Sequence, residues 1–178
     1  MDREVILYAK ASLDGFLADS QGQTDWLKGY GLEQEPDPGF QSLMDRVDTV
    51  IMGRITYEQM ASRFLPDRWP YEGMECYVAT TQFLEDTQQV TFWPGDLEEL
   101  VFLLKQRPGK HIWLMGGARL IQGFLERELI DSYWISLAPV FLGEGIRLFP
   151  GGDYRQDLIL DQVLEHDGML TCIYYNRA

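Results

Sequence analysis

The chain has 178 residues, of which 46% are hydrophobic and 13% aromatic, and this composition predicts one globular domain over residues 1–178. The formal net charge is −13 and the sequence pI is about 4.4, so neither nucleic acid nor an anionic membrane surface is an expected partner. No apolar run approaches the ~18 residues that a membrane-spanning helix needs. The first residues run directly into a strand-like segment instead of a secretion signal, and we therefore expect a cytoplasmic protein.

The hydrophobic pattern predicts strands that alternate with helices. We expect strands over residues 5–12, 49–52, 76–80, 90–93, 111–115, 131–137, 158–165 and 169–176. We expect helices over residues 40–47, 56–64 and 118–127, and a further helix between Asp96 and Pro108, with Thr56 and Asp96 as N-caps. This order predicts an α/β fold, with a mixed, mostly parallel sheet flanked by helices and a C-terminal antiparallel hairpin. The irregular stretch 15–39 is long for a compact domain, which favours a functional loop.

Several common active-site signatures are absent from the sequence. It contains no Walker phosphate loop, no G-x-G-x-x-G at the start of a helix and no G-x-S-x-G of serine hydrolases. His111 and His166 are its two histidines, and neither lies near a cysteine in the sequence, so we expect no zinc site. Cys76 and Cys172 lie in separate apolar segments and fit buried, reduced thiols.

Two junctions, each a strand followed by glycine and then by a helix, are the strongest candidates for ligand binding. In the first, Gly53 precedes Arg54, whose guanidinium can hold a phosphate, and Thr56 at the expected start of a helix. In the second, Gly116 and Gly117 would expose backbone N–H groups ahead of a helix, which suits a pyrophosphate. A glycine between a strand and a helix is also common packing. Together, however, the two junctions predict a dinucleotide groove at the carboxyl ends of parallel strands.

The segments around these junctions resemble the dihydrofolate-reductase-like superfamily. Residues 50–58, VIMGRITYE, are similar to its segment that contacts the NADPH phosphates, and residues 114–125, LMGGARLIQGFL, to its glycine-pair junction. Residues 12–18, SLDGFLA, and 138–145, APVFLGEG, resemble the reductase domain of the bifunctional riboflavin-biosynthesis protein. The resemblance covers nearly the whole chain, with the motifs in the same order. It implies the fold of that superfamily, NADPH as the cofactor and a reductase activity.

The resemblance also implies roles for individual residues. Ala11 and Leu17 would border the nicotinamide, and residues 22–26 would form a lid over it. The cofactor's phosphates and adenosine would be held by Gly53, Arg54, Thr56, Thr80, Thr81, Gly116, Gly117, Ala118, Arg119 and Leu120. Related enzymes often carry a tyrosine near the nicotinamide where this chain has Ile121. Because no arginine follows Thr81, a 2′-phosphate would be recognised by Arg54 or Arg119, and the preference for NADPH over NADH depends on these two.

Acidic residues are the candidates for a proton donor and a substrate anchor. Hydride transfer asks the protein for one proton donor, and Asp14 and Asp25 are the candidate catalytic residues. Trp26 and Asp37 are the candidate substrate-binding residues, and Glu35 is a further acid in the same loop. Simpler interpretations are a turn residue for Asp14 and a solvated loop charge for Asp37. Folate enzymes bind the pterin through a helix carboxylate, whereas Asp37 lies between two prolines, so we expect dihydrofolate to be a poor substrate.

Two functions of different classes are compatible with the sequence. The first is an NADPH-dependent reductase of a small heterocyclic or carbonyl-type substrate, similar to 5-amino-6-(5-phosphoribosylamino)uracil reductase. The alternative is a non-catalytic relative that binds a nucleotide or metabolite in the same groove. The apolar, aromatic C-terminal segments 133–135, 140–142 and 173–175 predict a symmetric homodimer, as the resemblance also implies, unless the hairpin covers its own sheet.

Overall fold

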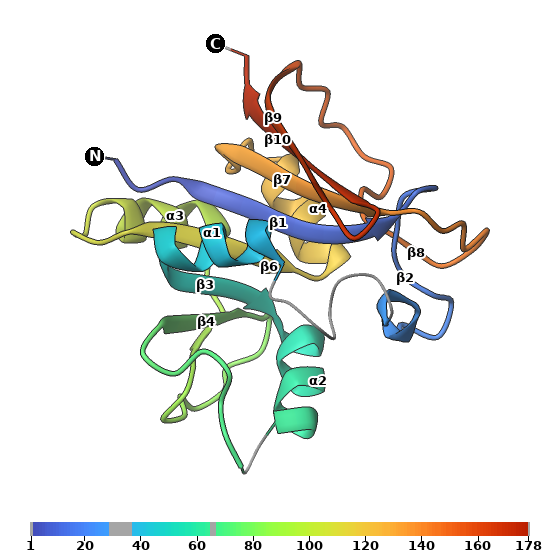
Figure 1. Cartoon of the computed structure of the whole chain (residues 1–178). Coiled ribbons are helices and arrows are strands. Elements are labelled where there is room, and N and C mark those ends of the chain that lie inside the picture. Colours follow the sequence, from blue (N-terminus) through green and yellow to red (C-terminus); the bar gives the residue numbers. More distant parts are fainter. Residues whose placement is uncertain (1, 29–36, 65–66, 178) are drawn as a thin grey trace.

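An eight-stranded sheet forms the centre of the molecule in the computed structural model, which describes residues 2–28, 37–64 and 67–177 (Figure 1). Its strand order is β5-β4-β3-β6-β1-β7-β10-β9. The first six of these strands run parallel: β5 (Thr91–Trp93), β4 (Glu75–Ala79), β3 (Val47–Gly53), β6 (His111–Gly116), β1 (Val5–Ser12) and β7 (Ser132–Ala138). The last two, β10 (Met169–Asn176) and β9 (Leu158–His166), add an antiparallel hairpin. Two short strands, β2 (Phe16–Ala18) and β8 (Ile146–Arg147), pair separately.

Helices cover both faces of this sheet. One face packs against α1 (Pro38–Arg46) and α2 (Arg54–Phe64), and the other against α3 (Leu97–Lys105) and α4 (Ala118–Leu125). A short helix, η1 (Asp25–Leu27), lies beyond the end of the sheet where β1 ends (Figure 1). The expected mostly parallel sheet, with flanking helices and a C-terminal hairpin, is confirmed.

The central strand β1 shows why its sequence is almost continuously apolar. It is paired on both sides, with β6 and with β7, and its side chains alternate between two cores. Leu7 points into the core under α3 and α4, whereas Ile6 and Tyr8 point into the core under α1. The hairpin turn after β9 is built by Asp167 and Gly168, both with positive φ, as a tight two-residue turn requires.

Two helix starts differ from the expectation. We expected Thr56 to be the N-cap of α2, and this is wrong, because β3 passes directly into the helix and α2 begins at Arg54. Helix α1 begins at Pro38, two residues before the expected start, since the Asp37 carboxylate caps it by accepting from the backbone N–H groups of Gly39 and Phe40. Among the residues that the structure describes, no helix has the length and hydropathy needed to cross a bilayer.

Candidate functional site

The two glycine junctions meet at the carboxyl ends of β3 and β6, which are neighbouring parallel strands. A Cβ atom built on Gly53 would lie 3.7 Å from the backbone oxygen of Gly116 and 3.7 Å from the nitrogen of Gly117. A Cβ atom on Gly117 would lie 3.4 Å from Oγ1 of Thr56. The first turns of α2 and α4 are therefore adjacent. The sequence motifs predicted this arrangement, because a shared binding site needs both junctions at one place.

The start of α4 has backbone donors and no competing acid. Gly117 is its N-cap and supplies no side-chain hydrogen bond, and neither α2 nor α4 carries an acidic residue in its first turn. Gly116 adopts φ +111°, which side-chain-bearing residues rarely tolerate, and its peptide bond to Gly117 is cis. An uncapped helix N-terminus beside a second one binds anions through N–H groups and helix dipoles. This donor set fits the pyrophosphate of a dinucleotide.

The arginines and threonines assigned to the cofactor lie around this junction. Arg54 forms an ion pair with Glu58 one turn further along α2, and Arg119 is exposed in the first turn of α4. Gly53 pairs with Ala79, so Thr80 and Thr81 extend from the same edge of the sheet. Recognition of a 2′-phosphate by Arg54 or Arg119, and with it the preference for NADPH over NADH, stays a prediction.

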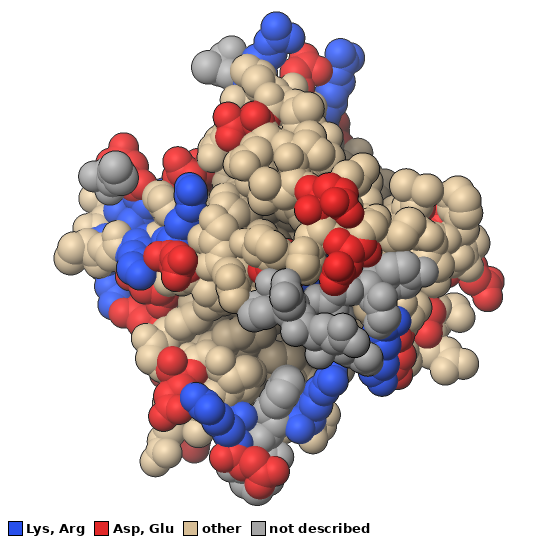
Figure 2. All heavy atoms as spheres, viewed as in Figure 1, with Lys and Arg blue, Asp and Glu red and all other residues tan. Residues whose placement is uncertain are grey.

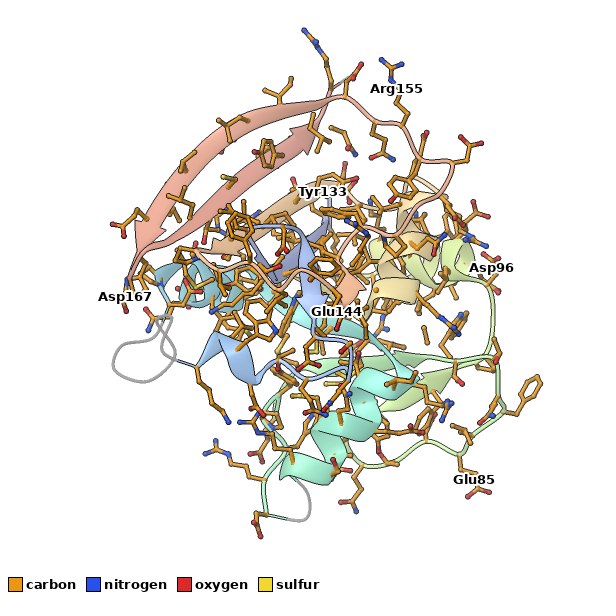
Figure 3. All side chains as sticks on the ribbon, turned by 90° about the vertical axis from the view of Figure 1, so that its right-hand side faces the viewer. Glu85, Asp96, Tyr133, Glu144, Arg155 and Asp167 are labelled. Carbon is orange, nitrogen blue, oxygen red and sulfur yellow. The ribbon has the colours of Figure 1, made fainter. Side chains whose placement is uncertain are left out.

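The residues assigned to the nicotinamide lie together on the α3/α4 side of the sheet. Ala11, near the end of β1, is fully buried in that core, and Leu17 in β2 is half-buried against it. Figure 3 looks onto the edge where β1 ends, with Glu144 of the loop after β7 near the centre of the view. The structure thus places both residues at the α3/α4 core, and their cofactor role stays a prediction.

The Asp14 carboxylate links the loop after β1 to the loop after β7 through hydrogen bonds. It accepts hydrogen bonds from the Ser12 hydroxyl at 2.6 Å, from the Leu142 N–H at 3.1 Å and from the Gly143 N–H at 2.8 Å. The hydrogen bond from Ser12, followed by those from the two backbone groups, lowers the pKa of Asp14 to about 2. A carboxyl group with this pKa is ionised at neutral pH, so Asp14 is poorly suited to donate a proton, and its predicted catalytic role is untested.

Asp25 and Trp26 belong to η1. Asp25 is exposed and pairs with Lys28 at 2.6 Å, and the hydrogen bond and charge of that lysine lower the pKa of Asp25. Trp26 packs beside Ala138 and Met169, and its Nε1 is buried with no hydrogen-bond partner among the residues described. On the face shown in Figure 2, basic side chains lie over α2 and η1. Glu35 lies outside the described residues.

Asp37 is part of a buried polar cluster that the sequence did not reveal. Its Oδ2 atom accepts from the Tyr8 hydroxyl at 2.6 Å and lies 2.8 Å from Nζ of Lys10. Burial raises the pKa of Asp37, but the hydrogen bonds from Lys10 and Tyr8 outweigh it, and the net pKa is lowered. Burial, and then the hydrogen bond to Asp37, raise the pKa of Tyr8, which therefore remains a neutral donor.

Two signals could have pointed to this cluster. Lys10 is a charged residue inside a mostly apolar buried strand, and Asp37 directly precedes a proline at a helix start, which is typical of an N-cap. We expected Asp37 to be a loop residue between two prolines, whereas the structure makes it a helix cap whose side chain is 10% exposed. A helix carboxylate is therefore present beside the sheet.

The strand order, the paired glycine junctions and the terminal hairpin define a dihydrofolate-reductase-like fold. Residues 3–171 match the model of the RibD C-terminal domain, and the chain belongs to that family. This confirms the resemblance seen in the sequence.

Relatives and solved structures support the same family. The chain is 39% identical over 150 residues to the uncharacterised protein YwjB of Bacillus subtilis (strain 168), covering 84% of each chain. It is 33% identical to the uncharacterised protein YyaP of the same organism, covering 97% of this chain and 95% of that one. The crystal structure of a putative riboflavin biosynthesis protein from Shewanella sp. PV-4 superposes with a TM-score of 0.87 at 29% identity, covering 98% and 99% of the two chains.

A Thermotoga maritima diaminohydroxyphosphoribosylaminopyrimidine deaminase/5-amino-6-(5-phosphoribosylamino)uracil reductase shares the fold. The TM-score is 0.71 at 17% identity, and the match covers 99% of this chain and 57% of that one.

Proposed function

We propose that this protein is an NADPH-dependent reductase of a small heterocyclic or carbonyl-type substrate, similar to 5-amino-6-(5-phosphoribosylamino)uracil reductase. The observation that carries the proposal is the contact between the two glycine junctions, which places two acid-free helix starts side by side. Membership of the RibD C-terminal domain family supports it, as do the names of structural neighbours, which include a pyrimidine reductase-like protein from Corynebacterium diphtheriae.

NADPH, when bound, supplies a hydride to the substrate. The chain's own contribution begins with Gly53, Gly116 and Gly117, which let backbone approach the pyrophosphate closely, and with the first N–H groups of α4, which would bind it. Arg54 and Arg119 would offset the remaining phosphate charge. Asp14 and Asp25 both have lowered pKa values, so we infer that the proton reaches the substrate from water or from another group of the site.

The test is NADPH binding by a Gly117→Val variant. Gly117 has an ordinary φ of −70°, and Thr56 Oγ1 is the atom nearest to an added Cβ, at 3.4 Å, so the variant should fold. In the unchanged protein, NADPH should quench tryptophan fluorescence and raise the melting temperature, because a ligand that binds the native state stabilises it. The valine side chain should abolish both effects by filling the space between the two helix starts.

The matched control is Gly151→Val. Gly151 has no heavy atom within 4 Å of an added Cβ and lies in an exposed loop, so this variant should bind NADPH normally. Normal NADPH affinity in the Gly117→Val variant would refute the pyrophosphate site.

A non-catalytic nucleotide-binding relative is the second candidate function. The surroundings of Asp14 and Asp25 favour it, because hydrogen bonds stabilise the charged form of each carboxylate and lower its pKa, the opposite of what a proton donor needs. NADPH binding without oxidation by any pyrimidine, pteridine or carbonyl compound in a broad screen would support this second candidate over the reductase.

A further inference from the structure

The Asp37 carboxylate has no hydrogen-bonding capacity left for a ligand. Its Oδ1 atom accepts from the N–H groups of Gly39 at 2.9 Å and Phe40 at 3.4 Å, and its Oδ2 atom contacts Tyr8 at 2.6 Å and Lys10 at 2.8 Å. An ionised carboxylate offers about four lone-pair positions. A substrate that needs to donate two N–H groups to an acid, as a pterin does, would have to displace partners that the fold itself supplies.

The ammonium group of Lys10, in contrast, is paired with a single acid among the residues that the structure describes. A lysine ammonium carries three N–H donors. Within residues 2–28, 37–64 and 67–177, Asp37 is its ion-pair partner, and the lysine side chain is 14% exposed. Donors that are withdrawn from water gain most from an electron-rich acceptor, because leaving them unpaired is costly.

The strand pairing shows which residues lie on either side of Lys10 in the sheet. On one side Lys10 pairs in register with Ser136 of β7, which in turn pairs with Thr171 of β10, and the hydroxyls of these two buried residues lie 2.6 Å apart. On the other side the pairing of β1 with β6 ends at Leu7 and Leu114, three residues before Lys10. Lys10 therefore lies in the carboxyl-terminal part of β1, beyond the residues that pair with β6, at the same end of the parallel sheet as the glycine junctions.

We propose that Lys10 is the residue that binds the substrate, and that this site takes a heterocycle presenting a carbonyl or anionic oxygen instead of a pair of N–H donors. Asp37 and Tyr8 are then positioning residues that hold the lysine in place. The proposal deepens the proposed function by naming the substrate class, and it rests on that function for the role of the bound compound.

Two ring compounds of the same size distinguish the alternatives. Barbiturate is an anionic pyrimidine rich in carbonyl oxygens, whereas 2,4-diaminopyrimidine offers N–H donors to a carboxylate. We expect calorimetric titration of the full chain to show binding of barbiturate in preference to 2,4-diaminopyrimidine. Lys10→Met should weaken barbiturate binding about ten-fold or more, Lys10→Arg should retain part of it, and Asp37→Asn should change it less than Lys10→Met does.

A matched control separates the lysine's role in binding from the loss of an ion pair. Lys105 also pairs with an aspartate, Asp131 at 2.7 Å, but on α3, so Lys105→Met should leave barbiturate affinity unchanged. If Lys10→Met fails to fold, the double variant Lys10→Met/Asp37→Asn removes the pair without leaving a buried charge, and it should show the same loss.

Three outcomes would overturn the lysine assignment: preference for 2,4-diaminopyrimidine, absence of binding by either compound, or unchanged barbiturate affinity without Lys10. NADPH titration of the same samples reports separately on the proposed function. If the Lys10→Met variant loses barbiturate binding and still binds NADPH, both proposals are supported. Barbiturate binding in a protein that does not bind NADPH supports the lysine site and refutes the reductase.

Discussion

The pair formed by Lys10 and Asp37 should be strongly coupled in the folded protein. The two atoms lie 2.8 Å apart and the side chains are 14% and 10% exposed, so water screens the interaction little. Removing one partner from a buried pair costs about 3–5 kcal/mol. Asp37 keeps three other hydrogen bonds when the lysine is lost, so we expect Lys10→Met to lower the free energy of unfolding by about 3 kcal/mol, the lower end of that range.

A double-mutant cycle isolates this coupling. The variants Lys10→Met, Asp37→Asn and the double variant should yield a coupling energy of about 2 kcal/mol, as charge-assisted hydrogen bonds do. The cycle on Lys105 and Asp131 provides the comparison, because that pair is equally close at 2.7 Å but 32% and 37% exposed. Exposed pairs couple by about 0.2–1 kcal/mol.

Urea denaturation, followed by tryptophan fluorescence and far-UV circular dichroism, measures each free energy. The two optical signals should give the same midpoint if unfolding is two-state. Equal coupling energies for the two pairs would refute the reasoning, because burial is what distinguishes them.

Three further predictions concern the substrate, the assembly and a loop. Dihydrofolate should be reduced far more slowly than the ~10 s⁻¹ typical of enzymes, and a rate near that value would show that Asp37 is available to a pterin. We also propose a symmetric homodimer through β9, whose apolar side chains Leu158, Ile159, Leu160 and Val163 are 40–53% exposed. Light scattering should then give twice the mass of one 20.6 kDa chain, and the mass of a single chain would end this proposal. The lowered pKa of Asp14 means that its hold on the loop after β7 is present above pH 4, the ordinary range of the group, and is lost as the pH falls through about 2. The Gly143 amide resonance should titrate with that low midpoint and should not titrate in an Asp14→Asn variant.

Much of the fold could be predicted from the sequence because each strand of the eight-stranded sheet carries its own signal, whereas the short strands β2 and β8 were not predicted. The alternation of apolar segments with turn residues predicted both the parallel strands and the hairpin around Asp167, and glycine marked both junctions correctly. The start of α2 could not be placed, because β3 passes into the helix with no intervening cap residue for a motif to mark.

The polar cluster around Asp37 and the contacts of Asp14 were harder to predict because the residues that meet are distant in the chain. Tyr8 and Asp37 are 29 residues apart, and Asp14 reaches Gly143 across 129 residues. Local patterns can mark a single residue as unusual but do not show which distant residue it meets, because such contacts depend on how strands pair and on where a loop returns. The reductase activity, the cofactor preference, the cytoplasmic location and the absence of nucleic-acid and membrane partners stay predictions.

Asp37 has two duties at once, as the cap of α1 and as the counter-ion of Lys10. A mutation of Asp37 therefore destabilises the fold, whatever its effect on ligand binding, and is selected against for that reason. Ser136 and Thr171 lie in the same row of the sheet and cap no helix, so replacing both together removes one side-chain hydrogen bond and leaves the cap of α1 in place. We expect new substrate preferences to evolve, or to be selected in the laboratory, through those hydroxyl positions while the aspartate stays fixed.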